Sequence, residues 1–295
     1  WRPLMRQVLA RLWPARAGGC EFVSAVARPY AAQLIAAVLG APSDDAQLLD
    51  EWSAWARRQS DPRGLAANAP RIERAVVALT RYVTRLVDKP HRPSSDLISD
   101  LVAARVNDDQ LSSRELVNLV VNLIVEGIGP VRNQLANAIQ LFATYPEQWE
   151  LLAARPGLVP RAAAEVLRFE PASPFITRIC LRDVEYRGVL FPEGTVVAVC
   201  VERANRQLAG GEHFDITAER DGPAATFGAG PHFCLGASLA RAELEEALAY
   251  LAPRSPGLAL DGIPDGLPEG LDKLPVRWQR PVEPAAAGIR SIRYQ

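Results

Sequence analysis

Residues 227–236, which read FGAGPHFCLG, are the most informative segment of this chain. Its three glycines let the backbone approach a large flat ligand closely and turn amides toward a sulfur atom. Residues 235–251 have the apolar spacing of a helix, so Cys234 would lie at a helix N-terminus, where the helix dipole favours the metal-binding thiolate. The alternative for an isolated cysteine is a small, inert core residue, and only the surrounding pattern argues against it.

Helical spacing of apolar residues dominates the rest of the chain. The expected helices are Pro3–Leu12, Phe22–Leu39 with Gly40 as its C-cap, Ser43–Arg57, Arg71–Val87, Asp96–Val106, Pro146–Ala153 and Val159–Arg168. A longer helix begins at Ser113 and is apolar on nearly every face, which predicts that it is buried. Its apolar run stops at Glu126, short of the ~20 residues that cross a bilayer, so we expect a core helix and no membrane span.

A change of pattern after the helices predicts a small sheet region. Its expected strands, separated by turn signals, are Ile176–Leu181, Val184–Tyr186, Val189–Phe191 and Thr195–Val201. We find neither an internal repeat nor a linker that would divide the chain. The sequence therefore predicts one mainly α domain with a minor β region over residues 1–280, followed by a Pro/Ala-rich tail at 281–295.

Composition excludes several classes of protein. The 295 residues are 48% hydrophobic and 23% charged, which is typical of a soluble globular chain and not of a disordered one. The 33 basic residues are balanced by 34 acidic ones, so we expect neither a nucleic-acid partner nor an anionic membrane surface. The four cysteines are widely spaced, which argues against a disulfide framework and fits a reducing cytoplasm.

Residues 227–236 contain every fixed position of the haem-binding loop of cytochromes P450, F-G-x-G-x-H-x-C-x-G, and the chain resembles that family. The resemblance implies that Cys234 is the proximal ligand of a haem b iron and that His232 hydrogen-bonds a haem propionate. It also implies that Phe227, Gly228 and Gly236 belong to the cofactor-binding loop. A thiolate ligand pushes electron density onto the iron and favours O–O cleavage.

Two further segments resemble parts of the same family. Glu165 and Arg168 match its E-x-x-R scaffolding motif, although by spacing alone they would be an ordinary solvated pair. The third member of that network, an arginine in the family, falls on His213, and Arg206 is the other candidate. Arg178 resembles the strand arginine that pairs with a propionate, the alternative being a solvent-facing strand arginine.

The resemblance runs from the helix at Pro3, similar to the family's helix D, to Trp278. It implies that about the first quarter of a P450 is not in this chain, including helices A to C and a loop that sets substrate specificity. The chain opens at Trp1 and its only methionine is Met5, so we do not expect Trp1 to be a natural start. At residues 207–211 the family's Asp-Pro and aromatic-rich segment is replaced by QLAGG, so haem-pocket support is expected to differ there.

The long helix departs from the family where most members carry A-G-x-E/D-T. Aligned without gaps, this segment falls on Glu126-Gly127-Ile128-Gly129-Pro130. Glycine and proline supply neither the titratable group nor the hydroxyl that the acid–alcohol pair uses to relay protons. Pro130 also lacks an N–H and crowds the carbonyl of Glu126, so the helix is expected to open there.

Glu126 is the candidate replacement acid, in an apolar setting that would favour its protonated form. Its alternative is a helix-end carboxylate that faces water or pairs with Arg132. The peroxide-using branch of the family carries Arg-Pro in this place. Pro130 matches that proline, but Gly129 stands where the arginine would be, and Arg132 comes three residues too late.

Three functions follow from the resemblance. The first is a bacterial haem-thiolate oxidoreductase that hydroxylates or otherwise oxidises a hydrophobic small molecule in specialised metabolism, with electrons from a ferredoxin or a similar donor. The second is a peroxide-dependent or otherwise atypical P450, because of Gly129 and Pro130. The third is a P450-like, non-enzymatic partner of a biosynthetic enzyme, against which the complete Cys234 loop argues.

Overall fold

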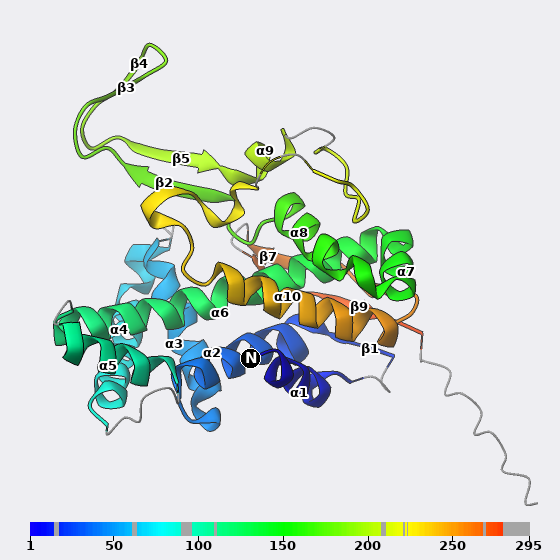
Figure 1. Ribbon diagram of the computed structural model, residues 1–295, viewed down its shortest axis with the longest axis horizontal. Helices are drawn as coiled ribbons and strands as arrows, with labels where there is room; N and C mark the ends of the chain where they lie inside the picture. Colours follow the sequence, from blue (N-terminus) through cyan, green and yellow to red (C-terminus); the bar gives the residue numbers. More distant parts are fainter. Residues whose placement is uncertain are drawn as a thin grey trace, which may run out of the picture.

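The computed structural model describes residues 1–14, 18–60, 64–89, 96–108, 111–207, 211–220, 222, 224–267 and 270–279. Within these ranges the chain is mainly helical, with a few small sheets (Figure 1). The predicted fold class is therefore confirmed. The predicted tail at 281–295 and residues 208–210 of the replaced segment lie outside the described residues.

The first five helices follow the expected periodicity. They are α1 (Arg2–Leu12), α2 (Arg28–Leu39), α3 (Ala46–Arg57), α4 (Leu65–Val87) and α5 (Leu97–Asp108). A π-helical turn at Val23–Ala27 leads into α2, and Gly40 ends α2 in the left-handed conformation at φ 73°, as expected of a glycine C-cap. Helix α4 starts well before the predicted Arg71, because Pro70 lies near its exposed N-terminal end and removes only one helical hydrogen bond.

Helix α6 (Ser113–Thr144) is the central element, with 32 residues. A capping box opens it: the Glu115 N–H donates to Ser112 Oγ at 3.2 Å, and the Ser112 N–H donates to Glu115 Oε2 at 2.8 Å. The expected opening of the helix at Pro130 is wrong, because α6 stays helical through that residue. Packing against α2, α3 and α10 on several sides compensates for the single hydrogen bond that proline cannot make to the Glu126 carbonyl.

The remaining helices are α7 (Pro146–Ala154), α8 (Val159–Phe169), α9 (Val201–Arg206) and α10 (Ala237–Leu251). The short helix α9 was not predicted, because its six residues are too few to show a helical period. Two apolar clusters form the core: one lies among α1, α7, α8, α10 and the second half of α6, the other among α2 to α5 and the first half of α6. Within the described residues, no helix is both long enough and apolar enough to cross a membrane.

Four predicted strands are present as two antiparallel pairs, one of them inserted between the strands of the other. Strand β2 (Phe175–Ile179) pairs with β5 (Val196–Cys200), and β3 (Val184–Tyr186) pairs with β4 (Val189–Phe191). Together they project from the helical body as one long arm (Figure 1). The remaining strands were not predicted: they are β1 (Gly19–Glu21), β6 (Ala259–Leu260), β7 (Asp265–Leu267), β8 (Gly270–Lys273) and β9 (Pro275–Arg277).

Long-range pairing joins the early and late parts of the chain. Strand β9 lies between β1 and β6, with Cys20 opposite Val276. Beside this sheet the indoles of Trp13 and Trp278 stack with ring centroids 4.3 Å apart. The β1–β9–β6 sheet therefore holds α1 and the start of α2 against the segment that follows α10, the helix nearest Cys234.

Candidate functional site

The Cys234 loop connects a single helical turn at Gly230–His232 to α10. The Cys234 N–H donates to the carbonyl of Phe227 at 2.9 Å, which folds the loop back on itself. Gly228 and Gly230 both have φ of 72°, in the region that residues with a side chain rarely adopt. These two glycines set the course of the loop, and the Cys234 thiol is exposed ahead of the α10 N-terminus.

Exposed apolar side chains flank this thiol. Phe233 is 52% exposed and Leu235 is 79% exposed, and residues 229–235 are exposed throughout. An apolar surface around a single exposed thiol fits a large flat apolar group that presents one metal atom to sulfur. The residues present therefore fit a haem. Gly236, which was predicted to belong to the cofactor-binding loop, is the N-cap residue of α10 and directly follows this surface.

Strand β2 lies beside the Cys234 loop. A Cβ at Gly228 would stand 3.8 Å from Ile176 Cδ1, so the strand that carries Arg178 lies against the loop that carries His232. Arg178 is exposed, and its Nη1 donates to the carbonyl of its neighbour Thr177 at 2.9 Å. His232 is exposed as well. Both side chains are accessible to an anionic group.

The Phe227 ring anchors the beginning of the loop. The Arg241 guanidinium of α10 stands 4.9 Å from the Phe227 ring centroid, within cation–π range, and the Phe233 ring centroid lies 6.4 Å from it. Phe227 thus ties the loop to the helix that follows Cys234.

Glu165 and Arg168 form a buried ion pair on α8. Arg168 donates from Nε to Glu165 Oε2 at 2.7 Å and from Nη2 to Oε1 at 2.8 Å. Their side chains are 4% and 3% exposed, respectively, so this is not the solvated pair that spacing alone would suggest. Burial by itself raises the pKa of Glu165, but the hydrogen bonds from Arg168 and Arg220 outweigh it and lower the pKa.

The third charged member of this network is Arg220. Its Nη2 donates to Glu165 Oε1 at 2.8 Å and to the His213 carbonyl at 2.9 Å. His213 contributes that carbonyl, and its side chain is exposed. Arg206 donates instead to the Phe169 carbonyl and to Glu170 Oε2, at 3.1 Å in each case. Of the two candidates for the third member, His213 takes part through its carbonyl, whereas Arg206 pairs with Glu170 and does not contact Glu165.

Asn205 connects this network to the Cys234 loop. It is 1% exposed, and its side-chain amide donates to the Arg168 carbonyl at 3.1 Å and to Thr226 Oγ1 at 3.0 Å. Its Oδ1 accepts from the Ala225 N–H at 2.7 Å. Because Ala225 and Thr226 directly precede Phe227, the buried pair on α8 sets where the loop starts.

Glu126 lies on the open side of α6. Its side chain is 66% exposed, and Arg57 Nη1 of α3 donates to its Oε2 at 3.2 Å. The apolar setting expected for Glu126 is therefore wrong, and its partner is Arg57 and not Arg132. Arg132 donates to Asn133 Oδ1. One helical turn after Glu126, Pro130 is half-buried.

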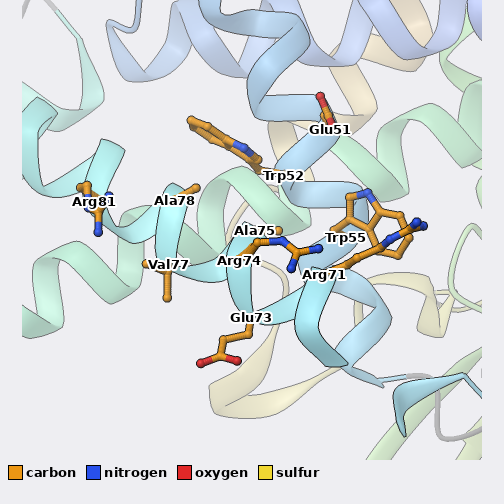
Figure 2. A pocket seen from close by; sticks show the side chains of 10 residues that line it. All are labelled: Glu51, Trp52, Trp55, Arg71, Glu73, Arg74, Ala75, Val77, Ala78 and Arg81. Atoms are coloured by element: carbon orange, nitrogen blue, oxygen red, sulfur yellow. The ribbon is translucent and has the colours of Figure 1, made fainter. Parts of the chain in front are cut away.

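A separate groove lies between α3 and α4 and contains none of the predicted site residues. Its volume is about 810 Å³, and it is lined by the indoles of Trp52 and Trp55 and by several arginines of α4. Figure 2 shows Arg71 beside Trp55, with the guanidinium 5.3 Å from the indole centroid. Glu51 and Glu73 lie in the same groove, so its charge is mixed.

Comparisons with known proteins identify the family of this chain. The family Cytochrome P450 matches residues 157–251, which include the α8 ion pair and the Cys234 loop. The luteothin monooxygenase of Streptomyces thioluteus is 36% identical over 247 residues, which cover 80% of this chain and 59% of that protein. The cytochrome P450 107B1 of Saccharopolyspora erythraea is 33% identical over 290 residues, covering 94% of this chain and 70% of the relative.

A solved structure gives the same result for the fold. The crystal structure of CalO2 superposes with a TM-score of 0.84 at 31% identity, over 95% of this chain and 73% of that one. The chain belongs to the cytochrome P450 family. It spans 59% of the length of the luteothin monooxygenase that it matches.

Three residues of the site are not predicted from the sequence. Arg220 was passed over because it follows His213 by seven residues, outside the spacing of the family motif. Arg57 was passed over because nothing in the local pattern of α3 distinguishes it from Arg58. Asn205 directly precedes the candidate Arg206, and the signal that could have found it is a polar residue on the apolar side of a short helix.

Proposed function

We propose that this protein is a haem-thiolate oxidoreductase that inserts oxygen into a hydrophobic small molecule, most simply by hydroxylation, in bacterial specialised metabolism. The exposed Cys234 thiol carries the proposal, because it stands in a glycine-shaped loop at the head of α10. A monooxygenase reaction is supported by the name of the luteothin monooxygenase, which matches 80% of this chain.

The proposed cofactor is haem b. Cys234 would hold the iron, His232 and Arg178 would meet the propionates, and Phe227, Gly228 and Gly236 would shape the loop beneath it. The chemistry that the bound haem supplies is oxygen activation, which electron donation from the thiolate favours. The apolar side chains of Phe233 and Leu235 would exclude water from the sulfur.

In this proposal Glu126 passes on protons in the place of Gly129 and Pro130, which have neither a carboxyl nor a hydroxyl group. Because Pro130 has no N–H, the carbonyl of Glu126 lacks its helical partner, and such a carbonyl is suited to anchor a water molecule. A water molecule bound to the Glu126 carbonyl would form a hydrogen-bonded link between the Glu126 carboxyl and the surroundings of Pro130. Pro130 and Glu126 would thus act as one proton-handling unit.

The proposal includes a partner, a compartment and a domain organisation. Electrons would come from a ferredoxin or a similar donor, and the wide spacing of the four cysteines supports a reducing, cytoplasmic setting. Residues 1–280 would form one domain, which is supported by the two apolar clusters that share α6.

The test is replacement of the cysteine. Protein with the wild-type sequence is expected to bind haem and to show, in its ferrous carbonyl form, the strongly red-shifted Soret band of a thiolate-ligated iron. Cys234→Ser should lose that band. The matched control is Cys180→Ser, a half-buried cysteine outside the loop, which should keep it. An unchanged spectrum in Cys234→Ser would exclude the proposed ligand.

A second candidate, peroxide-dependent oxidation, is favoured by one observation: residues 129 and 130 carry no titratable side chain and no hydroxyl. Product formation with NADH and an electron-transfer chain, compared with product formation from hydrogen peroxide, separates the two reactions. A non-enzymatic partner of a biosynthetic enzyme would show neither, and haem would not need to be present.

A further inference from the structure

The side chain of Arg57 lies across Gly129 of α6. A Cβ built at Gly129 would stand 2.7 Å from both Cδ and Nε of Arg57 and 3.0 Å from its Cζ. Atoms that close would be in steric conflict, so the position of the Arg57 side chain depends on the absence of a side chain at residue 129. Glycine at this position therefore makes room for a guanidinium from α3.

The Arg57 guanidinium then meets Glu126, one helical turn before Gly129. Residues three apart on a helix lie on the same face, so Glu126 and Gly129 both face α3. The Nη1–Oε2 distance is 3.2 Å, and Arg57 is the less exposed of the two, at 26% against 66% for Glu126. The better-packed arginine thus orients the more exposed carboxylate, and a carboxylate at 129 itself would collide with the Arg57 stem.

We propose that Arg57 is a positioning residue, which holds the Glu126 carboxylate beside the Gly129–Pro130 turn, and that Gly129 is required for this placement. The Arg57 guanidinium, which lies over Gly129, and the Glu126 carboxylate act together as an ion pair. Exposed ion pairs contribute little to stability, so the expected consequence of this pair is orientation and not folding. Its consequence for oxidation rests on the proposed function of Glu126, whereas the placement itself does not.

Gly127 offers a matched control for the steric part of the argument. A Cβ at Gly127 would stand 2.7 Å from Cδ1 of Ile35, so Gly127→Ala crowds α6 as much as Gly129→Ala does, but against α2. In both cases the crowded atom belongs to a flexible side chain. Only Gly129→Ala displaces Arg57.

The first experiment measures hydrogen exchange of the Arg57 side-chain N–H groups by NMR in the haem-loaded protein, with the resonances assigned through Arg57→Lys. Gly129→Ala and Glu126→Gln are each expected to speed this exchange by roughly fivefold, as loss of one hydrogen bond predicts. Gly127→Ala should leave it unchanged. The proposal would be overturned if Gly129→Ala and Glu126→Gln showed the same exchange rate as wild type. It would also be overturned if Gly127→Ala sped the exchange as much as Gly129→Ala does.

The second experiment measures product formed per NADH consumed. Arg57→Gln and Glu126→Gln should lower this ratio by the same factor. The double variant should lower it no further, because each single change already removes the Arg57–Glu126 ion pair. Arg57→Lys, which keeps the charge on a flexible stem, should recover part of the ratio. Additive effects of the two single variants would contradict a shared role.

Failure of the proposed function appears separately in these measurements. A wild-type protein without the thiolate spectrum or without product would contradict the oxidoreductase itself. Altered exchange in Gly129→Ala together with an unaltered ratio in Glu126→Gln would support the placement of Arg57 and remove Glu126 from proton handling.

Discussion

Glu165 keeps its negative charge inside the protein because two arginines reach it from different segments. Arg168 comes from the same helix, and Arg220 comes from the segment that leads toward the Cys234 loop. A buried carboxylate needs such partners, since an unpaired charge in the interior is strongly unfavourable. The same pairing fixes the position of the chain just before the loop.

Replacing Arg220 tests this network. Arg220→Gln should lower the free energy of unfolding by about 2 kcal/mol, less than the ~3–5 kcal/mol of a fully buried pair because the Arg220 side chain is 15% exposed. The matched control is His213→Ala, which keeps the carbonyl that both arginines use and should cost less than about 1 kcal/mol. Chemical denaturation of the two variants measures both values, and a larger loss in His213→Ala would contradict the assignment.

The pKa of a second buried acid, Glu243, is raised, whereas that of Glu165 is lowered. Glu243 of α10 is 3% exposed, and among the described residues its Oε2 has no hydrogen-bond partner. Burial raises the pKa of Glu243 to about 8. Because the folded-state pKa lies above the value of about 4.5 in the unfolded chain, the stability of the protein falls as the pH rises between these two values.

The variant Glu243→Gln should remove this pH dependence. Above about pH 8 the variant should be more stable than wild type by up to about 5 kcal/mol, and the difference should vanish near pH 4. Glu246→Gln on the same helix is the contrast: its pairing with Arg6 and Arg2 overcomes burial and lowers the pKa of Glu246, so its loss should cost stability at neutral pH. Denaturation midpoints across pH 4–9 decide between these trends.

At the scale of elements, helix ends join neighbouring helices. Gly40 ends α2 with φ of 73°. A Cβ at this residue would collide with the side chain of Asp96. Asp96 in turn caps α5, since its Oδ1 accepts from the Ser99 N–H at 2.8 Å. Gly40 therefore ends α2 and also leaves room for the Asp96 side chain that caps the start of α5.

Substitution at this junction should affect both helices. Gly40→Ala introduces backbone strain and pushes Asp96 out of its cap, so the expected loss is about 2–3 kcal/mol. Gly157→Ala is the matched control, because a Cβ there has no neighbour within 4 Å, and it should change stability by less than about 0.5 kcal/mol. Amide exchange in the first turn of α5 should be faster in Gly40→Ala alone; equal protection in both variants would contradict the junction.

At the scale of the whole molecule, α6 connects two apolar clusters. Phe142 in its second half belongs to the cluster with α8 and α10, and Leu116 near its start belongs to the cluster with α3 and α4. A single rigid helix through both clusters should make them unfold together, because neither can lose α6 alone.

This coupling can be measured with one change in each cluster. Phe142→Ala should cost about 3–5 kcal/mol and Leu49→Ala about 2–5 kcal/mol, since both side chains are fully buried. Each variant should shift the whole unfolding transition, seen alike by far-UV circular dichroism and tryptophan fluorescence. Leu181→Ala, at an 87% exposed position, should shift neither. Two separated transitions in either core variant would show that the clusters unfold independently.

Features that depend on near neighbours along the chain could be predicted from the amino-acid sequence. Apolar spacing predicted most helices, and alternation with turn signals predicted β2 to β5. The glycines and Cys234 of residues 227–236 predicted the loop, because backbone conformation there depends on residue types within ten positions. Glu165 and Arg168 were predicted as a pair for the same reason, since they lie one helical turn apart.

The distant groups that complete these local units became visible in the three-dimensional structure. Arg220 and not His213 meets Glu165, and Arg57 of α3 reaches Glu126 of α6 across Gly129. The pairing of β1 with β9 brings together residues from opposite parts of the sequence. Such contacts depend on how helices and loops pack in three dimensions, and neither periodicity nor spacing along the chain carries that information.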